Sequence, residues 1–146
     1  MPSASYQRQR FSNPKDYPPD LPFSDAVLAG DTLYVSGHVG IDMKARRIPA
    51  QLEDEVRLLM DGIKASVTQA GMTMHDVVNV TIYCPDLSLF ERFNAVYRSY
   101  FTAGKYPARA FLGSGPLIFG AHFEITAIAV RQPRPAKAAK TAGKKR

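Results

Sequence analysis

Cysteine and long apolar runs are the two features that this 146-residue sequence most clearly lacks. Its single cysteine, Cys84, excludes an internal disulfide and a cysteine-rich zinc site. No run of about 18 apolar residues is present, so the sequence gives no reason to expect a membrane-spanning helix. The polar stretch 1–13 has no apolar segment of the kind found in secretory signals. We therefore expect a reducing, cytoplasmic setting.

Acidic charge is absent from the C-terminal end of the chain. Residues 131–146 hold seven basic residues and no acidic one, whereas residues 1–130 hold 12 basic and 13 acidic residues. The net charge of +6 therefore belongs to this end, and the rest of the chain is close to neutral. Residues 132–146 are expected to form a disordered basic tail. No aromatic residues are interleaved with its charges, so a solubilising role is favoured over nucleic-acid binding, which is expected to be weak at most.

What the sequence does contain is enough alternating strand and helix pattern for one domain. Residues 1–21 are polar and carry several prolines, which predicts an irregular lead-in. Residues 22–131 form the predicted domain. Its first two segments, 25–30 and 32–39, are typical of short strands, and a Gly-Asp pair between them favours a hairpin turn.

Two amphipathic helices are predicted. The first spans residues 51–70 and is followed by Gly71, which stands where a C-terminal cap glycine belongs. Its apolar stripe comprises Val56, Met60, Ile63, Val67 and Ala70. The second helix begins near Ser88, which is spaced from Glu91 as in a capping box. Its buried side comprises Leu89, Phe93, Val96, Tyr97 and Tyr100.

Three more strands complete the predicted order β-β-α-β-α-β-β. Residues 76–84 alternate as a strand does, and Pro85 ends them. One predicted face comprises Val78, Val80, Ile82 and Cys84, and the other comprises Val77, Asn79, Thr81 and Tyr83. The last two strands begin near Ala108 and Ala121.

The predicted sheet has more surface than its helices can cover. Two helices cover only one face, and the other face is neither strongly charged nor strongly apolar. Its members are expected to include Thr81, Tyr83, His122, Glu124 and Thr126. A face of this composition favours a subunit interface over open solvent, so we expect an oligomer whose sheets face one another. His38 is also expected to point into that interface.

Arg109 and Glu124 are charged residues inside strand-like segments near the end of the predicted domain. A buried guanidinium or carboxylate costs free energy unless it is paired or used. Arginine binds carboxylates through two parallel hydrogen bonds, and a glutamate nearby can hold or activate water. The two residues therefore indicate a site for a small carboxylate substrate. A structural ion pair at a subunit interface is the alternative.

Other reactive residue types favour ordinary structural roles. Cys84 stands at a strand end with no histidine near it in sequence, so it is interpreted as a small core residue and not as a nucleophile. The three histidines, His38, His75 and His122, are spread at no metal-ligand spacing, so a metal site is not expected.

Six short stretches carry a resemblance to one family. They are residues 22–27, 33–38, 76–83, 93–101, 107–109 and 124–129. The most specific are the Pro-Ala-Arg of 107–109 and the Glu-Ile-Thr-Ala-Ile-Ala of 124–129. Together they resemble the Rid family of reactive-intermediate deaminases, also called the YjgF/UK114 family, from about Pro22 to Arg131.

The resemblance implies a fold and an activity. The fold is the α+β fold of chorismate mutase, with one mixed β-sheet and two helices packed on one face. Three chains form a homotrimer around a central β-barrel, with clefts between subunits. The implied reaction is hydrolysis of enamine and imine intermediates, such as 2-aminoacrylate and 2-iminopropionate, to 2-keto acids and ammonia. No metal or organic cofactor is implied.

The resemblance also implies roles for individual residues. Arg109 matches the arginine that binds the substrate carboxylate, and Glu124 matches the glutamate associated with the hydrolytic water. Asn94, Ser36 and Gly37 match other pocket positions.

Two pocket positions depart from the family's pattern. Phe23 stands where active deaminases often carry tyrosine, and Phe111 stands where they often carry cysteine or another small residue. A different substrate, a smaller pocket or lost activity would follow from these changes. A trimer that binds small carboxylates without turning them over is therefore one alternative function. An RNA-binding or nuclease role is a further alternative, which only the basic tail supports and the near-neutral charge of residues 1–130 argues against.

Overall fold

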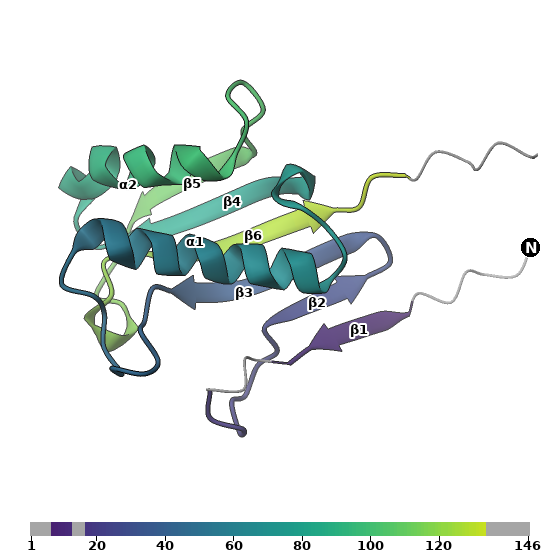
Figure 1. Ribbon diagram of the computed structural model, residues 1–146, viewed down its shortest axis with the longest axis horizontal. Coiled ribbons are helices and arrows are strands. Elements are labelled where there is room, and N and C mark those ends of the chain that lie inside the picture. Colours follow the sequence, from purple (N-terminus) through teal and green to yellow (C-terminus); the bar gives the residue numbers. More distant parts are fainter. Residues whose placement is uncertain (1–6, 13–16, 134–146) are drawn as a thin grey trace, which may run out of the picture.

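The computed structural model describes residues 7–12 and 17–133. Six strands form one sheet in the order β1-β2-β3-β6-β4-β5, and two helices lie on one of its faces (Figure 1). The strands are β1 (Arg8–Phe11), β2 (Ala26–Ala29), β3 (Thr32–Val39), β4 (Val77–Cys84), β5 (Ala108–Gly113) and β6 (Glu124–Val130). The helices are α1 (Leu52–Gln69) and α2 (Phe90–Tyr97). Four 3₁₀ turns are η1 (Met74–Asp76), η2 (Leu87–Leu89), η3 (Arg98–Tyr100) and η4 (Ile118–Gly120).

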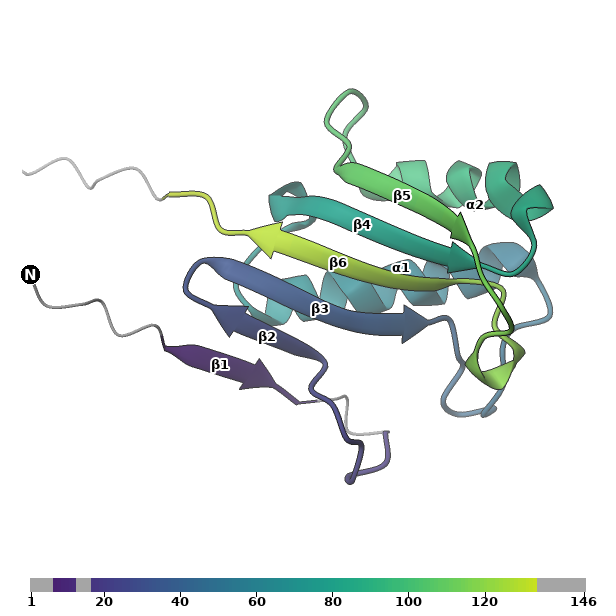
Figure 2. The same ribbon diagram turned by 180° about the vertical axis from the view of Figure 1, so that it is seen from behind.

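The sheet is mixed because one pair of neighbouring strands is joined by a crossover connection that contains a helix. β4 and β5 run parallel and are joined through α2, whereas every other pair of neighbouring strands is antiparallel. β2 and β3 form the predicted hairpin, whose two-residue turn begins at Gly30 with a φ of 61°. Figure 2 shows the face of the sheet that neither helix covers.

Helix α1 forms where the apolar spacing predicts it. All five residues of its predicted stripe are buried against the sheet, chiefly against β3 and β6. Gly71 ends the helix with a φ of 73°, a left-handed conformation that glycine adopts without a Cβ penalty. In the described part of the chain, no helix is long and apolar enough to cross a membrane.

Two predicted features near the chain's beginning and middle were wrong. The lead-in is not irregular throughout, because Arg8–Phe11 form β1 and pair with β2. The second helix is not capped by a Ser88–Glu91 box. Asp86 caps the preceding turn, since its carboxylate accepts hydrogen bonds from both the backbone nitrogen and the hydroxyl of Ser88.

A β-bulge changes the predicted faces of β4. The register with β6 shifts between Val77 and Asn79, so one extra residue is inserted there. Val77 is therefore buried in the core, and Val78, which was predicted to be buried, is 45% exposed. Beyond the bulge, the alternation follows the prediction, with Val80 and Ile82 in the core.

The uncovered face of the sheet contains most of the residues predicted for it. Thr81 pairs with Thr126, and Tyr83 pairs with Glu124, on the face opposite the core. Large apolar side chains that are exposed on these strands include Tyr34, Leu112 and Val130. His122 was predicted to belong to this face, but its ring instead contacts the buried carboxylate of Glu55 in α1.

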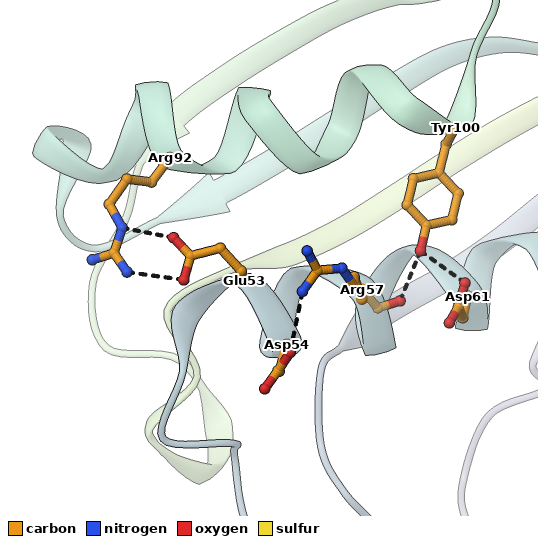
Figure 3. Close-up of polar contacts among 6 residues, drawn as sticks. All are labelled: Glu53, Asp54, Arg57, Asp61, Arg92 and Tyr100. Atoms are coloured by element: carbon orange, nitrogen blue, oxygen red, sulfur yellow. Dashed lines mark hydrogen bonds and ion pairs between the residues drawn. The ribbon is translucent and has the colours of Figure 1, made fainter.

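Polar contacts join the two helices at their outer surfaces (Figure 3). The guanidinium of Arg92 in α2 donates two hydrogen bonds, of 3.0 and 3.1 Å, to the carboxylate of Glu53 in α1. The hydroxyl of Tyr100 donates to Asp61 at 2.8 Å. These contacts fix the position of α2, which carries one wall of the candidate site.

Candidate functional site

Arg109 lies on the edge strand β5 and points toward α2. In the parallel pairing of β4 and β5 it stands beside Val80, a core residue, so its side chain lies on the helix-covered face. Its Nη1 donates a 2.7 Å hydrogen bond to the side-chain oxygen of Asn94. Asn94 is only 6% exposed, which is unusual for an amide in the middle of a helix. The predicted site residues Arg109 and Asn94 are thus brought together.

Aromatic rings surround the Arg109 guanidinium. Its Cζ atom lies 4.9 Å from the ring centre of Tyr97, 5.5 Å from that of Phe90 and 5.6 Å from that of Phe111. Such contacts stabilise a cation and reduce its exposure to water. Among the residues described, Arg109 has no carboxylate within ion-pair distance. A guanidinium has five N–H donors, so donors remain for an anion.

A shallow cavity of about 300 Å³ opens beside this guanidinium. It is lined by Asn94, Tyr97, Arg98, Tyr106, Pro107 and Arg109. The volume is at the small end of the range for ligand sites and suits a compact molecule.

Tyr97 is a site residue that the sequence pattern assigned only to the core. Its hydroxyl is buried and has no hydrogen-bond partner among the described residues. Burial raises the pKa of this hydroxyl to about 12, so it is a neutral donor at physiological pH. Its spacing of three residues from Asn94 places both on one side of α2, which is the signal that could have identified it.

Phe111 lies beside Arg109 on the same face of β5. Its ring makes edge contacts with Phe90 at 5.0 Å and Phe93 at 5.4 Å between ring centres. The ring thus extends the aromatic core up to the guanidinium and occupies space next to it. Phe23, the other departure from the family pattern, precedes β2 and is 51% exposed.

Glu124 begins β6 on the opposite, uncovered face of the sheet. Its neighbour Ile125 is buried in the core, and strand alternation turns Glu124 away from it. Gly37 lies directly against this carboxylate, because a Cβ atom built at Gly37 would collide with the Oε1 atom of Glu124. Only glycine permits this approach without displacement. Ser36 and Gly37 stand where the β3–β6 register shifts between Val35 and His38.

The predicted residues therefore form two separate groups in one chain. Arg109, Asn94 and Phe111 lie on the helix-covered face, whereas Glu124 and Gly37 lie on the uncovered face. Within one chain the sheet separates the Arg109 and Glu124 side chains, so the alternative of a structural ion pair at a subunit interface stays a prediction.

The remaining reactive residues mostly have structural partners. Cys84 is buried as predicted, its thiol donates to the Asp86 carbonyl at 3.0 Å, and burial raises its pKa. His38 was predicted to point into a subunit interface, but its ring lies beneath the sheet against Asp25 and α1. The predicted basic tail lies, from residue 134 onward, outside the described residues.

Comparison with known proteins gives a single family. Residues 15–131 match the family described as Endoribonuclease L-PSP. A RutC family protein of Pyrococcus horikoshii is 36% identical over 112 residues, which cover 76% of this chain and 88% of that protein. The 2-iminobutanoate/2-iminopropanoate deaminase of Escherichia coli is 33% identical over 113 residues, again covering 76% of this chain and 88% of the relative.

Solved structures agree with the sequence matches. The YjgF gene product of Escherichia coli superposes with a TM-score of 0.71 at 33% identity, over 76% of this chain and 89% of that one. Escherichia coli TdcF with bound serine gives a TM-score of 0.76 at 29% identity, over 85% and 100%. The chain belongs to the Rid family, also called the YjgF/UK114 family, as its motifs predicted. Its six-stranded mixed sheet with two helices is the fold of that family.

Proposed function

We propose that this protein hydrolyses small imines and enamines that carry a carboxylate, of the 2-iminopropionate and 2-aminoacrylate type, to 2-keto acids and ammonia. The single observation that carries the proposal is the Arg109 guanidinium, held by Asn94 and without a carboxylate partner among the described residues, beside a small cavity. Relatives named as a reactive intermediate deaminase and as a 2-iminobutanoate/2-iminopropanoate deaminase support the reaction type. The related structure of Escherichia coli TdcF with bound serine supports a ligand of this size.

Imine hydrolysis requires the protein to bind and orient the substrate and water more than it requires strong acid–base catalysis. Arg109 binds the substrate carboxylate bidentately, and an enamine first tautomerises to the imine. Water adds to the electrophilic imine carbon and forms a carbinolamine. The C–N bond then breaks, ammonia leaves, and the carbon keeps the water oxygen as the new carbonyl. Glu124 orients the attacking water and accepts its proton, and proximity supplies most of the rate increase.

The proposal places the complete site between subunits. In one chain Arg109 and Glu124 lie on opposite faces of the sheet, so a second copy must bring its Glu124 and Gly37 to the Arg109 cavity. A homotrimer whose sheets face one another around a central barrel would do this and would cover the apolar side chains on the uncovered face.

The test is the disappearance of 2-iminopropionate that an amino acid oxidase generates in the assay, followed by trapping with semicarbazide. Wild type should accelerate hydrolysis over the uncatalysed rate, and Arg109→Ala should lose nearly all of that acceleration. Arg57→Ala is the matched control, because Arg57 is an exposed arginine whose partner is Asp54 on the same helix. Retention of most activity by Arg109→Ala would refute the assignment.

Carboxylate binding without turnover is a second candidate, which the position of Phe111 favours. Its ring lies against the guanidinium, where it limits the space for a reacting group. This candidate predicts that pyruvate binds in an Arg109-dependent manner, as measured by calorimetry, while no imine is turned over. Phe111→Cys should then create activity.

A further inference from the structure

Asp25, His38 and Ser66 form a buried polar cluster that has no part in the reaction as proposed above. They come from the segment before β2, from β3 and from α1, respectively. The Nε2 atom of His38 lies 3.0 Å from Oδ1 of Asp25, and the two side chains are 12% and 14% exposed. The Ser66 hydroxyl donates to the other carboxylate oxygen of Asp25. The cluster thus links three elements beneath the sheet.

The hydrogen-bond partners of His38 favour its charged form. Its Nδ1 atom lies 2.6 Å from the carbonyl oxygen of Ser36, which can only accept, so Nδ1 carries a proton. Its Nε2 atom faces the Asp25 carboxylate, which also accepts, so Nε2 carries a proton as well. An imidazole with donors on both nitrogens is a cation. His38 and Asp25 are therefore an ion pair, and Ser66 satisfies the second carboxylate oxygen.

The three residue types are those of a hydrolase triad, but their arrangement excludes that role. The Ser66 hydroxyl is directed to the carboxylate of Asp25 and lies 3.5 Å from Nε2 of His38. Ser66 is also only 1% exposed, so no substrate reaches it. An imidazolium has no lone pair with which to accept a proton from a nucleophile.

The cluster instead holds the backbone next to Glu124. His38 binds the carbonyl of Ser36, and the backbone nitrogen of Ser36 donates to the Asp25 carbonyl at 3.0 Å. The Ser36 hydroxyl is bound to the carbonyl of Ser24. The following residue, Gly37, is the one whose Cα lies against the Glu124 carboxylate. A shift of this bulge therefore moves the surface on which Glu124 rests.

We propose that His38 and Asp25 are positioning residues for the deamination proposed above: the His38 imidazolium, held by Asp25, fixes the Ser36–Gly37 bulge and thereby sets the direction of the Glu124 carboxylate. The inference rests on the proposed function. The deaminase activity would then depend on the His38 side chain, which does not touch the substrate. Turnover should be highest while His38 is protonated and should fall as that proton is lost.

The electrostatic surroundings of His38 raise the pH at which its ring loses the proton above that of an ordinary histidine. Burial by itself lowers the pKa of His38, but the hydrogen bonds to Asp25 and Ser36 and the charges of Asp25 and Glu124 outweigh it and raise the pKa above 6.5. Asp25 contacts the ring from the segment before β2, the uncharged Ser66 lies beside it on α1, and the charge of Glu124 acts on it from the other face of the sheet. Burial, together with the nearby charge of Asp25, raises the pKa of Tyr17.

The experiment compares His38→Ala, His38→Gln and the exposed control His75→Gln in the imine assay across pH, with background hydrolysis subtracted. His38→Ala should lower kcat/KM by roughly tenfold to a hundredfold, mainly through kcat, because Arg109 still binds the carboxylate. His38→Gln keeps one donor, so it should recover part of the activity and lose the decline at high pH. His75→Gln should match wild type in both rate and pH profile. The ¹⁵N resonances of His38 should show both nitrogens protonated at pH 6.5.

The outcomes separate this inference from the proposed function. A wild type that hydrolyses no imine overturns both. An active wild type, together with folded His38 variants of unchanged rate and pH profile, overturns only the role of His38. A neutral His38 ring at pH 6.5 also overturns it. Thermal unfolding of each variant shows whether a loss of activity results from loss of the fold.

Discussion

A single arginine, surrounded by aromatic rings, is the main basis for the proposed deaminase function. Three rings and one buried amide hold the Arg109 guanidinium, and each is placed there by its position on α2 or β5. Rings exclude water without competing for hydrogen bonds, so the remaining donors keep their strength for an anion. At this scale the most informative detail is the buried hydroxyl of Tyr97, which has no hydrogen-bond partner among the described residues.

Tyr97→Phe should raise stability and weaken the site. A buried donor without a partner costs free energy, so removing the hydroxyl should raise the free energy of unfolding by about 1 kcal/mol. The same change removes a donor next to Arg109 and should raise KM for the imine. Tyr100→Phe is the control, because it breaks a hydrogen bond to Asp61 and should lower stability. Urea unfolding and imine kinetics measure both effects. Lower stability in Tyr97→Phe would show that the hydroxyl is satisfied.

At the scale of elements, the bulge in β3 determines where Glu124 lies. Strand alternation alone would continue the pairing past Val35, but the register shifts before His38. The shift turns Gly37 toward Glu124 and turns His38 toward α1, where its ring lies against Gly62. A regular strand continued from the buried Val35 would instead turn Gly37 toward the core and His38 away from α1.

Gly37→Ala tests this approach of backbone to carboxylate. The new methyl group would collide with Glu124, so either the bulge or the carboxylate must move. We expect kcat to fall by roughly a hundredfold while the chain still folds. Gly115→Ala is the matched control, since a Cβ atom there meets nothing within 4 Å. Equal activity of both variants would show that Glu124 is not positioned by Gly37.

The Asp25–His38 pair should also make stability depend on pH. The raised pKa of His38 gives a contribution that is complete below 6.5 and is lost as pH rises through the folded-state pKa. For Asp25, the hydrogen bonds from His38 and Ser66 outweigh burial and lower the pKa, so its contribution is complete above 3.8 and is lost as pH falls further. At pH values between 3.8 and 6.5, Asp25→Asn should therefore have a lower melting temperature than wild type. A pH profile identical to that of wild type would contradict the pair.

The features that depend on residues close together in the sequence could be predicted, whereas those that depend on pairing between distant strands could not. Helix α1 and its cap follow from local spacing, and the Pro-Ala-Arg motif is enough to single out Arg109. The bulges were missed because one inserted residue reverses the faces, as at Val77 and Val78, and no local signal marks it. Strand β1 was missed because four mostly polar residues become a strand only when β2 pairs with them.

At the scale of the whole molecule, the uncovered face of the sheet supports the proposal that the site is shared between subunits. Tyr34, Leu112 and Val130 are exposed on that face, which also carries Glu124. A face of this kind favours association. Sedimentation equilibrium should give a mass near three times the 16.1 kDa of one chain. Tyr34→Glu should dissociate the assembly and abolish imine hydrolysis, although Tyr34 is not a substrate-binding residue. An active monomer would contradict a shared site.

The most direct test of a deaminase site shared between subunits mixes two inactive variants, Arg109→Ala and Glu124→Gln, by joint refolding. Each should be nearly inactive alone in 2-iminopropionate hydrolysis. In randomly mixed trimers, about one site in four pairs an intact Arg109 with an intact Glu124 from its neighbour, so about a quarter of wild-type activity should return. Mixtures no more active than the separate variants, while wild type refolded in the same way is active, would contradict the account.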